Sequence, residues 1–204
     1  MKPFIVTLTG PSCAGKSTLE AMLKSEGFAN VISTTTRQPR VGEVDGESYY
    51  FVTRDTFRRI ADKGGLVEEV AFNGNYYGVG VDEVERVSAQ GKPIVVIVEP
   101  NGLAQVREYA LKHGWDILSI LVNNPIPVIC ERFLRRMTNE LAASKSDEER
   151  AKIISTYASR MTVMKEEWSW RDTCEVDMTI SSFNEHNCGD WVRLIKQHAQ
   201  KLGW

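Results

Sequence analysis

Apolar and polar residues alternate along the chain in a way that predicts strands followed by helices. Residues 4–9 form an apolar, β-branched run that ends at a glycine, which is typical of a buried strand, and residues 16–27 then show helical spacing at Leu19 and Leu23. Further strands are expected at 92–100, 116–124 and 175–182, and helices at 54–65, 81–91, 102–114, 127–170 and 188–204. Because strands joined by helices form parallel sheets covered on both faces, we predict an α/β fold with a central parallel sheet.

Residues 31–80 do not fit this alternation. The segment 31–53 is rich in Thr, Val and Tyr and contains turn residues, which predicts short antiparallel strands around a loop. A short helix beginning at Asp55 and a pair of strands with a turn at 73–75 should follow. We therefore interpret 31–80 as an inserted lobe, and the polar helical region 132–160 as a second, mobile piece.

Composition and charge narrow the class of protein. A chain of 204 residues with 42% hydrophobic residues suits one globular domain. Its 25 Lys and Arg against 27 Asp and Glu give a net charge of -2, so we expect no nucleic-acid or membrane partner, and any phosphate binding must be local.

The cysteines and the N-terminus indicate a compartment. The four cysteines form neither CxxC pairs nor a Cys/His cluster with metal-ligand spacing, as expected of free thiols under reducing conditions. The N-terminal apolar run is too short for a signal peptide, and no run approaches the roughly 20 residues of a membrane span. We expect a cytoplasmic protein.

The stretch GPSCAGKST, residues 10–18, carries the clearest chemistry. It matches G-x-x-x-x-G-K-[ST] between a predicted strand and a predicted helix, where backbone N–H groups can face a polyphosphate. Lys16 would reach the β- and γ-phosphates, and the Ser17 hydroxyl would be a ligand of Mg²⁺. The residues expected to bind the phosphates of the nucleotide are Gly10, Pro11, Ser12, Cys13, Ala14, Gly15, Lys16, Ser17 and Thr18. GTPases, ATPases and small-molecule kinases share this loop, so it does not identify the acceptor.

A second phosphate site is indicated by Arg37 and Arg40, which flank a proline turn and are followed by Tyr49. Two guanidinium groups and a phenol suit a terminal phosphate dianion, which arginine grips with two parallel hydrogen bonds.

Together, the motifs GPSCAGKST, STTTRQPRVGEVDGESYYFV, NGNYYG and VEPNG resemble the guanylate kinase family, clearly over residues 4 to about 136. The resemblance implies a P-loop kinase fold with a central parallel sheet flanked by helices, a small mixed α/β nucleotide-binding lobe and a helical lid. It implies one domain, with a core at 1–32, 81–130 and 171–204, a lobe at about 33–80 and a lid at about 131–170. The implied reaction is phosphorylation of GMP or dGMP by ATP with Mg²⁺.

The resemblance also assigns roles to residues. Arg37, Arg40, Tyr49 and Tyr77 would hold the acceptor phosphate, Ser33 and Glu68 would face its base, and Glu99 would lie near the acceptor. Lys16 and the lid arginines Arg132, Arg136 and Arg160 would act on the transferring phosphoryl group.

Several positions depart from the family pattern. Val79 stands where a Ser or Thr usually meets the guanine O6, and Ile97 and Glu99 stand where two Asp are common. Ser182 stands where the family tends to have an asparagine near the adenine. The stretch from Arg136 to Arg160 is longer than the usual lid, and an enlarged lid, an oligomer contact or a solvated insertion would explain it, of which we favour the last. A hydroxyl missing from a polar pocket can change base preference.

Other functions stay open at this point. One is a deoxynucleoside or modified-purine monophosphate kinase on the same scaffold, which the departures favour. A ribose bisphosphate kinase would not use Ser33, Glu68 and Tyr77. A non-catalytic binding module usually has a degraded phosphate loop, and a GTPase switch would carry an N-K-x-D motif, which we do not find. The chain could be a monomer or a homodimer.

Overall fold

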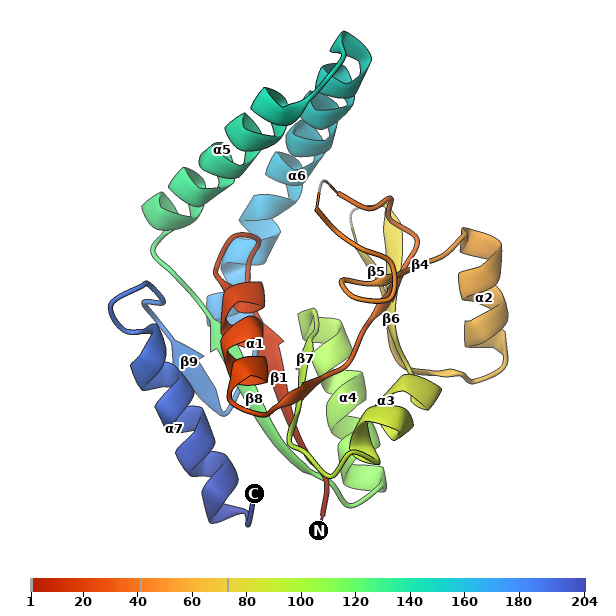
Figure 1. Ribbon diagram of the computed structural model, residues 1–204, viewed down its shortest axis with the longest axis vertical. Helices are drawn as coiled ribbons and strands as arrows, with labels where there is room; N and C mark the ends of the chain where they lie inside the picture. Colours follow the sequence, from red (N-terminus) through yellow and green to blue (C-terminus); the bar gives the residue numbers. More distant parts are fainter. Residues whose placement is uncertain (1, 41, 73) are drawn as a thin grey trace.

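The computed structural model describes residues 2–40, 42–72 and 74–204, which form two sheets and the helices around them (Figure 1). The larger sheet has five parallel strands in the order β2-β7-β1-β8-β9. These strands are β1 Phe4–Thr9, β2 Ala29–Asn30, β7 Ile94–Ile97, β8 Asp116–Val122 and β9 Met178–Ile180. The expected α/β class and parallel central sheet are therefore confirmed.

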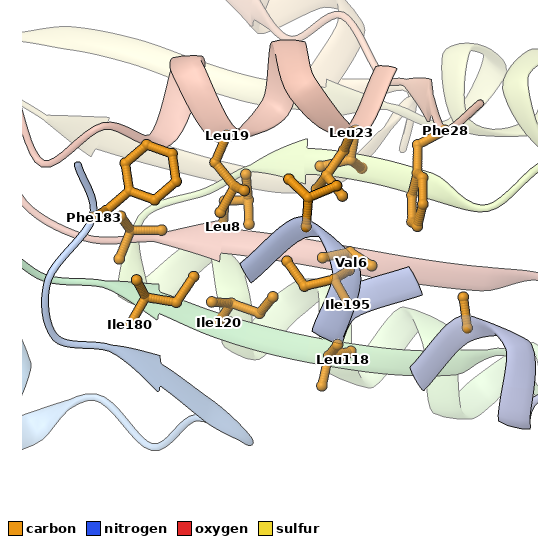
Figure 2. Packing of buried hydrophobic residues seen from close by; sticks show 14 of the residues in the cluster. Val6, Leu8, Leu19, Leu23, Phe28, Leu118, Ile120, Ile180, Phe183 and Ile195 are labelled. Carbon is orange, nitrogen blue, oxygen red and sulfur yellow. The ribbon is translucent and has the colours of Figure 1, made fainter. Parts of the chain in front are cut away.

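Helices cover both faces of this sheet, and they bury β1 on both sides. Phe4, Val6 and Leu8 point toward α1 Lys16–Ser25 and α7 Cys188–Lys201, and Figure 2 shows Leu19, Leu23 and Ile195 packed there. Burying each such leucine or isoleucine stabilises the fold by roughly 1.5 to 3 kcal/mol.

The other face of β1 presents Ile5 to α3 Val81–Ser88 and α4 Pro100–Lys112. Val84, Val106 and Val96 of β7 complete this second core. The two apolar faces hold the carboxyl ends of β1 and β7 in register, which is where the phosphate loop begins.

The smaller sheet has four strands in the order β4-β3-β6-β5. Its strands are β3 Thr34–Thr35, β4 Tyr50–Phe51, β5 Leu66–Phe72 and β6 Asn75–Gly80. The β5–β6 pair is antiparallel, as expected, but β3 and β4 are parallel, so the expectation of antiparallel strands around this loop was wrong for that pair. The intervening segment turns the chain back to the same end before β4 begins, and Tyr50 N donates to Ser33 O.

Helix α2, Arg54–Asp62, lies within the expected range 54–65, but Asp55 is not the residue that starts it. The cap is Thr53, whose Oγ1 accepts a hydrogen bond from Thr56 N, so Asp55 lies in the first turn instead of starting the helix. An acidic residue in the first turn is favoured by the helix dipole.

Two long helices, α5 Ile126–Ala143 and α6 Asp147–Thr173, run beside each other and extend away from the larger sheet (Figure 1). We call them the helical hairpin. The polar stretch near 139–152 is helical on both sides of a short break, and Ser146 Oγ caps α6 by accepting from Glu149 N. Within the described parts of the chain, no helix combines the length and the apolar character needed to span a bilayer.

Candidate active site

A cavity of about 1380 Å³ opens between the larger sheet, the smaller sheet and the helical hairpin. Its walls come from the phosphate loop, from β5 and β6, from the end of β7, and from α5 and α6. Segments far apart in the sequence therefore share one space, and that space contains most of the residues that the sequence singled out.

The phosphate loop joins β1 to α1, and its glycines are required by geometry. Gly10 has φ 146°, and a Cβ there would lie 2.1 Å from Val122 O. Gly15 has φ 109°, and a Cβ would lie 2.6 Å from the Phe183 ring. Only glycine accepts these backbone angles at such close approaches. The residues from 12 to 18 line the cavity, whereas Gly10 and Pro11 form the root of the loop.

Lys16 is drawn into this root. Its Nζ donates to Gly10 O at 2.5 Å and to Pro11 O at 3.0 Å. Burial lowers the pKa of Lys16, and the neighbouring carboxylates Glu99 and Glu167 oppose that effect. The ammonium group of Lys16 is thus held inside the phosphate loop, where it can contact a bound phosphate.

The three arginines expected in the lid lie on the helical hairpin and make different contacts. Arg132 donates to Ala14 O at 3.2 Å and to Phe183 O at 2.8 Å, so it ties the phosphate loop to the segment after β9. Arg136 pairs with Glu140 at 3.2 Å, and Arg160 donates to Ser12 Oγ at 2.9 Å. All three side chains line the cavity.

Two residues that matter here were missed in the sequence. Glu167 on α6 accepts hydrogen bonds from Ser12 N at 2.9 Å and from Ser12 Oγ at 2.8 Å. Asn124 donates to Ala14 O at 2.7 Å and accepts from Phe183 N at 2.9 Å. The spacing of seven residues between Arg160 and Glu167 places both on one face of a helix and was the available clue for Glu167.

The expected acceptor site gathers arginines and aromatic rings. Arg37 makes a bidentate pair with Glu43, at 2.9 and 3.0 Å, and lies 5.3 Å from the centre of the Tyr49 ring. The Tyr49 ring meets Tyr77 edge-on at 6.2 Å. These contacts orient Arg37 but do not use all of its hydrogen-bond donors, because its buried Nε has no hydrogen-bond partner among the described residues.

Arg40 has few compensating charges. Burial lowers its pKa to about 10, and the positive charges of Arg160, Arg37 and Arg136 add to the effect. Guanidinium groups from the smaller sheet and the hairpin therefore converge on Arg40, which disfavours its charge in the absence of an anion and favours binding one.

Two carboxyl groups lie deeper in the same cavity. Burial, reinforced by Glu99, raises the pKa of Glu68 to about 8, and Glu68 is only 3% exposed. Burial also raises the pKa of Glu99 to about 7, with Lys16 opposing. The Oε2 atom of each has no hydrogen-bond partner in residues 2–40, 42–72 and 74–204. Ser33 lines the same space, so this corner offers polar groups that a ligand can satisfy.

Val79 is not among the residues that line the cavity. It is 1% exposed and packs in the apolar core with Val84 and Val96, although it faces Glu68 across the strand pair. The apolar side chain at this position joins the core beneath the site, and a contact of Val79 with the acceptor stays a prediction. Ser182 also lies outside the lining, and its backbone oxygen accepts from Asn187 and Trp191, while residues 183–186 line the wall instead.

Oxygen ligands for a magnesium ion are available beside the phosphate loop. The Ser17 hydroxyl and the Glu99 carboxylate line the same cavity, and Glu99 Oε2 lacks a partner among the described residues. Mg²⁺ prefers oxygen ligands and is usually bound by one or two protein groups together with substrate phosphates. The residues present fit that requirement.

A phosphate loop on a parallel sheet, facing an arginine-rich pocket on a smaller sheet and a helical hairpin, defines a P-loop nucleoside monophosphate kinase fold. The family model described as guanylate kinase matches residues 1–174. This chain belongs to the guanylate kinase family.

Curated relatives agree with that assignment, and a solved structure shares the fold. A guanylate kinase of Chlorobium chlorochromatii (strain CaD3) is 35% identical over 160 residues, which is 76% of this chain and 82% of the relative. A guanylate kinase of Sus scrofa is 37% identical over 161 residues, covering 74% of this chain and 79% of the relative. The crystal structure of guanylate kinase from Anaplasma phagocytophilum superposes with a TM-score of 0.67 at 23% identity, over 98% of this chain and 86% of that one, and so shares the fold.

Proposed function

We propose that this protein transfers the γ-phosphoryl group of ATP to the phosphate of GMP or dGMP, which yields ADP and GDP or dGDP. One observation supports this above the others. The phosphate loop with Lys16 and the arginine pair Arg37 and Arg40 line the same cavity, so two phosphate groups can meet within it. Membership of the guanylate kinase family supports the same reaction.

The donor half of the reaction belongs to the phosphate loop. Backbone N–H groups at the start of α1 face the nucleotide phosphates, and the helix dipole adds to their positive potential. Lys16 would exchange its two carbonyl partners for phosphate oxygens. Ser17, with Glu99 nearby, would hold Mg²⁺ on the nucleotide, and the bound ion would neutralise phosphate charge.

The acceptor half belongs to the smaller sheet. Arg37, Arg40, Tyr49 and Tyr77 would hold the phosphate of the acceptor, whose anionic oxygen attacks directly, so no protein group is needed as a general base. The Glu68 carboxylate would accept from the guanine N1–H and N2–H₂ groups, with Ser33 beside it. Binding guanine in this way requires Glu68 to be ionised.

Charge that develops during transfer would be stabilised by Lys16 and by Arg136 and Arg160 from the helical hairpin. Arg132 would act by holding the loop to the neighbouring segment, since its donors already meet Ala14 O and Phe183 O. We assign residues 33–80 as the nucleotide-binding lobe and 131–170 as the lid, whose closure would exclude water.

Initial rates with ATP and each of GMP, dGMP, AMP, dAMP, UMP and dTMP test the proposal. We expect the guanine nucleotides to be phosphorylated with the highest kcat/KM. Equal or faster turnover of a nucleotide that lacks O6 would refute the guanine assignment while leaving a kinase.

A second candidate is a monophosphate kinase for another purine, including a deoxynucleotide. The buried Val79 supports it, because this position supplies no hydroxyl to the base. The same panel of nucleotides separates the two candidates. A non-catalytic binding module is disfavoured by the complete phosphate loop.

We further propose a cytoplasmic protein that acts on small nucleotides, as a monomer or homodimer, with no nucleic-acid or membrane partner. The balanced charge of -2 supports the last point. Light scattering coupled to gel filtration would establish the oligomeric state.

A further inference from the structure

The buried carboxylate of Glu167 lies in the site but has no role in the proposed reaction. It is 2% exposed, and its two oxygens accept both hydrogen bonds that Ser12 can donate, from the backbone N–H and from the hydroxyl. Ser12 Oγ in turn accepts from Arg160. Arg160, Ser12 and Glu167 therefore form one connected chain of hydrogen bonds between α6 and the phosphate loop.

The geometry of α6 explains how one helix makes both contacts. Arg160 and Glu167 are seven residues apart, close to two helical turns, so both project from the same face. Met164 lies between them on that face and is buried. The position of Arg160 over the loop thus depends on how α6 is rotated and shifted, and Glu167 fastens the same face of α6 to Ser12.

The hydrogen bonds from Ser12 to Glu167 hold the two groups more firmly than apolar contacts would. Hydrogen bonds to a carboxylate are charge-assisted and stronger than those between neutral groups. Burying a carboxylate costs free energy, and the two hydrogen bonds from Ser12 offset that cost, so Glu167 and Ser12 stabilise each other's positions. Glu167 also raises the pKa of Lys16 against the effect of burial, which places its charge within reach of the donor site.

We propose that Glu167 is a positioning residue for the donor half of the reaction. Through its hydrogen bonds to Ser12, Glu167 holds the phosphate loop in the conformation that binds the ATP phosphates. It also keeps Arg160 beside that loop. The identity of the nucleotide rests on the proposed function, but the positioning role concerns the loop itself.

Equilibrium binding provides the test, because it does not depend on turnover. ATP and GMP are titrated separately by calorimetry into the wild type, Glu167→Ala, Glu167→Gln and the control Glu166→Ala, whose side chain is exposed on the adjacent position. We expect Glu167→Ala to weaken ATP binding on the order of tenfold to a hundredfold, because Ser12 N–H and Oγ lose their acceptor. GMP binding should be unchanged, and Glu167→Gln should recover part of the ATP affinity through its amide oxygen.

Other results would overturn the proposal. Wild-type ATP affinity in Glu167→Ala would do so, and so would an equal loss of ATP and GMP affinity, since a merely structural residue would affect both. If Glu167→Ala does not fold, a double-mutant cycle of Glu167→Gln with Ser12→Ala decides the question. The loss of ATP affinity caused by Glu167→Gln should shrink when Ser12 Oγ is absent, whereas additive losses would contradict a role through Ser12.

The outcome for Glu167 is separable from the outcome for the reaction. A wild type that binds ATP but does not phosphorylate GMP would refute the proposed function and leave the ATP-binding comparison readable. A wild type that phosphorylates GMP, combined with normal ATP binding in both Glu167 variants, would refute only the positioning role.

Discussion

The donor and acceptor sides of the cavity are built in opposite ways. On the donor side, the polar groups of the phosphate loop bond within the protein: Lys16 to Gly10 O and Pro11 O, Ser12 to Glu167, and Ala14 O to Asn124. On the acceptor side, Glu68 keeps an oxygen without a partner among the described residues, and Arg40 lies among other guanidinium groups.

This difference shows how each side gains its ligand affinity. A loop whose polar groups are already bonded keeps its shape and loses little entropy when a phosphate binds. A pocket with a carboxyl oxygen that lacks a partner and with converging positive charges is electrostatically unfavourable when empty. A ligand of complementary charge and hydrogen bonding relieves this cost when it binds. Mutations on the donor side should therefore change catalysis and ATP affinity, whereas mutations on the acceptor side should change GMP affinity, its pH dependence and stability.

The largest expected effect separates catalysis from acceptor binding. Lys16→Ala removes the cation that stabilises the transferring phosphoryl group, and we expect kcat to fall on the order of a thousandfold. Equilibrium binding of GMP should stay near its wild-type value, because the acceptor pocket is built from other residues. Lys24→Ala, on the exposed side of the same helix, is the control. Unchanged turnover in Lys16→Ala would contradict the proposed mechanism.

The pH dependence of the free energy of unfolding should show how unfavourable the ionised form of Glu68 is in the folded protein. Its pKa is raised to about 8 in the folded protein from an ordinary value of 4.5, so the folded state disfavours the ionised form. The stability associated with protonated Glu68 is complete below pH 4.5 and is lost as pH rises to about 8. Glu68→Gln does not undergo this loss, so its free energy of unfolding relative to the wild type should rise by roughly 3 to 4 kcal/mol between pH 5 and pH 8.

Urea denaturation of both proteins at each pH measures that difference. A difference between Glu68→Gln and the wild type that stays constant with pH would show that Glu68 ionises as easily in the folded protein as in the unfolded chain. The proposed contrast between the two sides of the cavity would then lose its main support.

Gly102 at the start of α4 provides space for the Glu68 carboxylate. A Cβ at Gly102 would lie 2.6 Å from Glu68 Oε2, so Gly102→Ala must displace the carboxyl group, while the helix itself tolerates alanine well. We expect GMP affinity to fall about tenfold with ATP affinity unchanged. Gly189→Ala is the matched control, because a Cβ there meets nothing within 4 Å in the first turn of α7.

Calorimetric titration of both nucleotides into the two glycine variants provides the measurement. Equal GMP affinity in Gly102→Ala and Gly189→Ala would show that the position of Glu68 Oε2 does not control acceptor binding.

The smallest effect concerns pH. If GMP binds ionised Glu68, its affinity should rise as pH increases through about 8, where the pKa of the free protein lies. Between pH 7 and pH 8 the increase should be about fivefold, as the ionised fraction grows. Glu68→Gln should abolish this dependence, and ATP binding serves as the internal comparison. A GMP affinity that is constant over this range in the wild type would exclude the proposed guanine contact.

Much of the fold could be predicted because its determinants are local. The β-branched run of β1, the glycines of the loop and the helical spacing of Leu19 and Leu23 specify strand, loop and helix within a short segment. The parallel pairing of β3 and β4 could not be predicted, since two strands of two residues each carry almost no pattern and their direction depends on how the long loop between them returns. Thr53 as the cap of α2 was similarly hidden, because Asp55 is an equally acceptable capping residue by type.

The candidate site divides in the same way. The sequence by itself determined the chemical groups: a phosphate loop with Lys16, arginines for a second phosphate and carboxylates for a base, because residue type and short spacing specify these. Only the tertiary structure decided which of those groups remain available. Glu167 meets Ser12 across 155 positions of sequence, and Val79 enters the apolar core although it faces Glu68. Burial and hydrogen-bond partners arise from contacts between distant segments, and those contacts separate a side chain that binds a ligand from one that supports the fold.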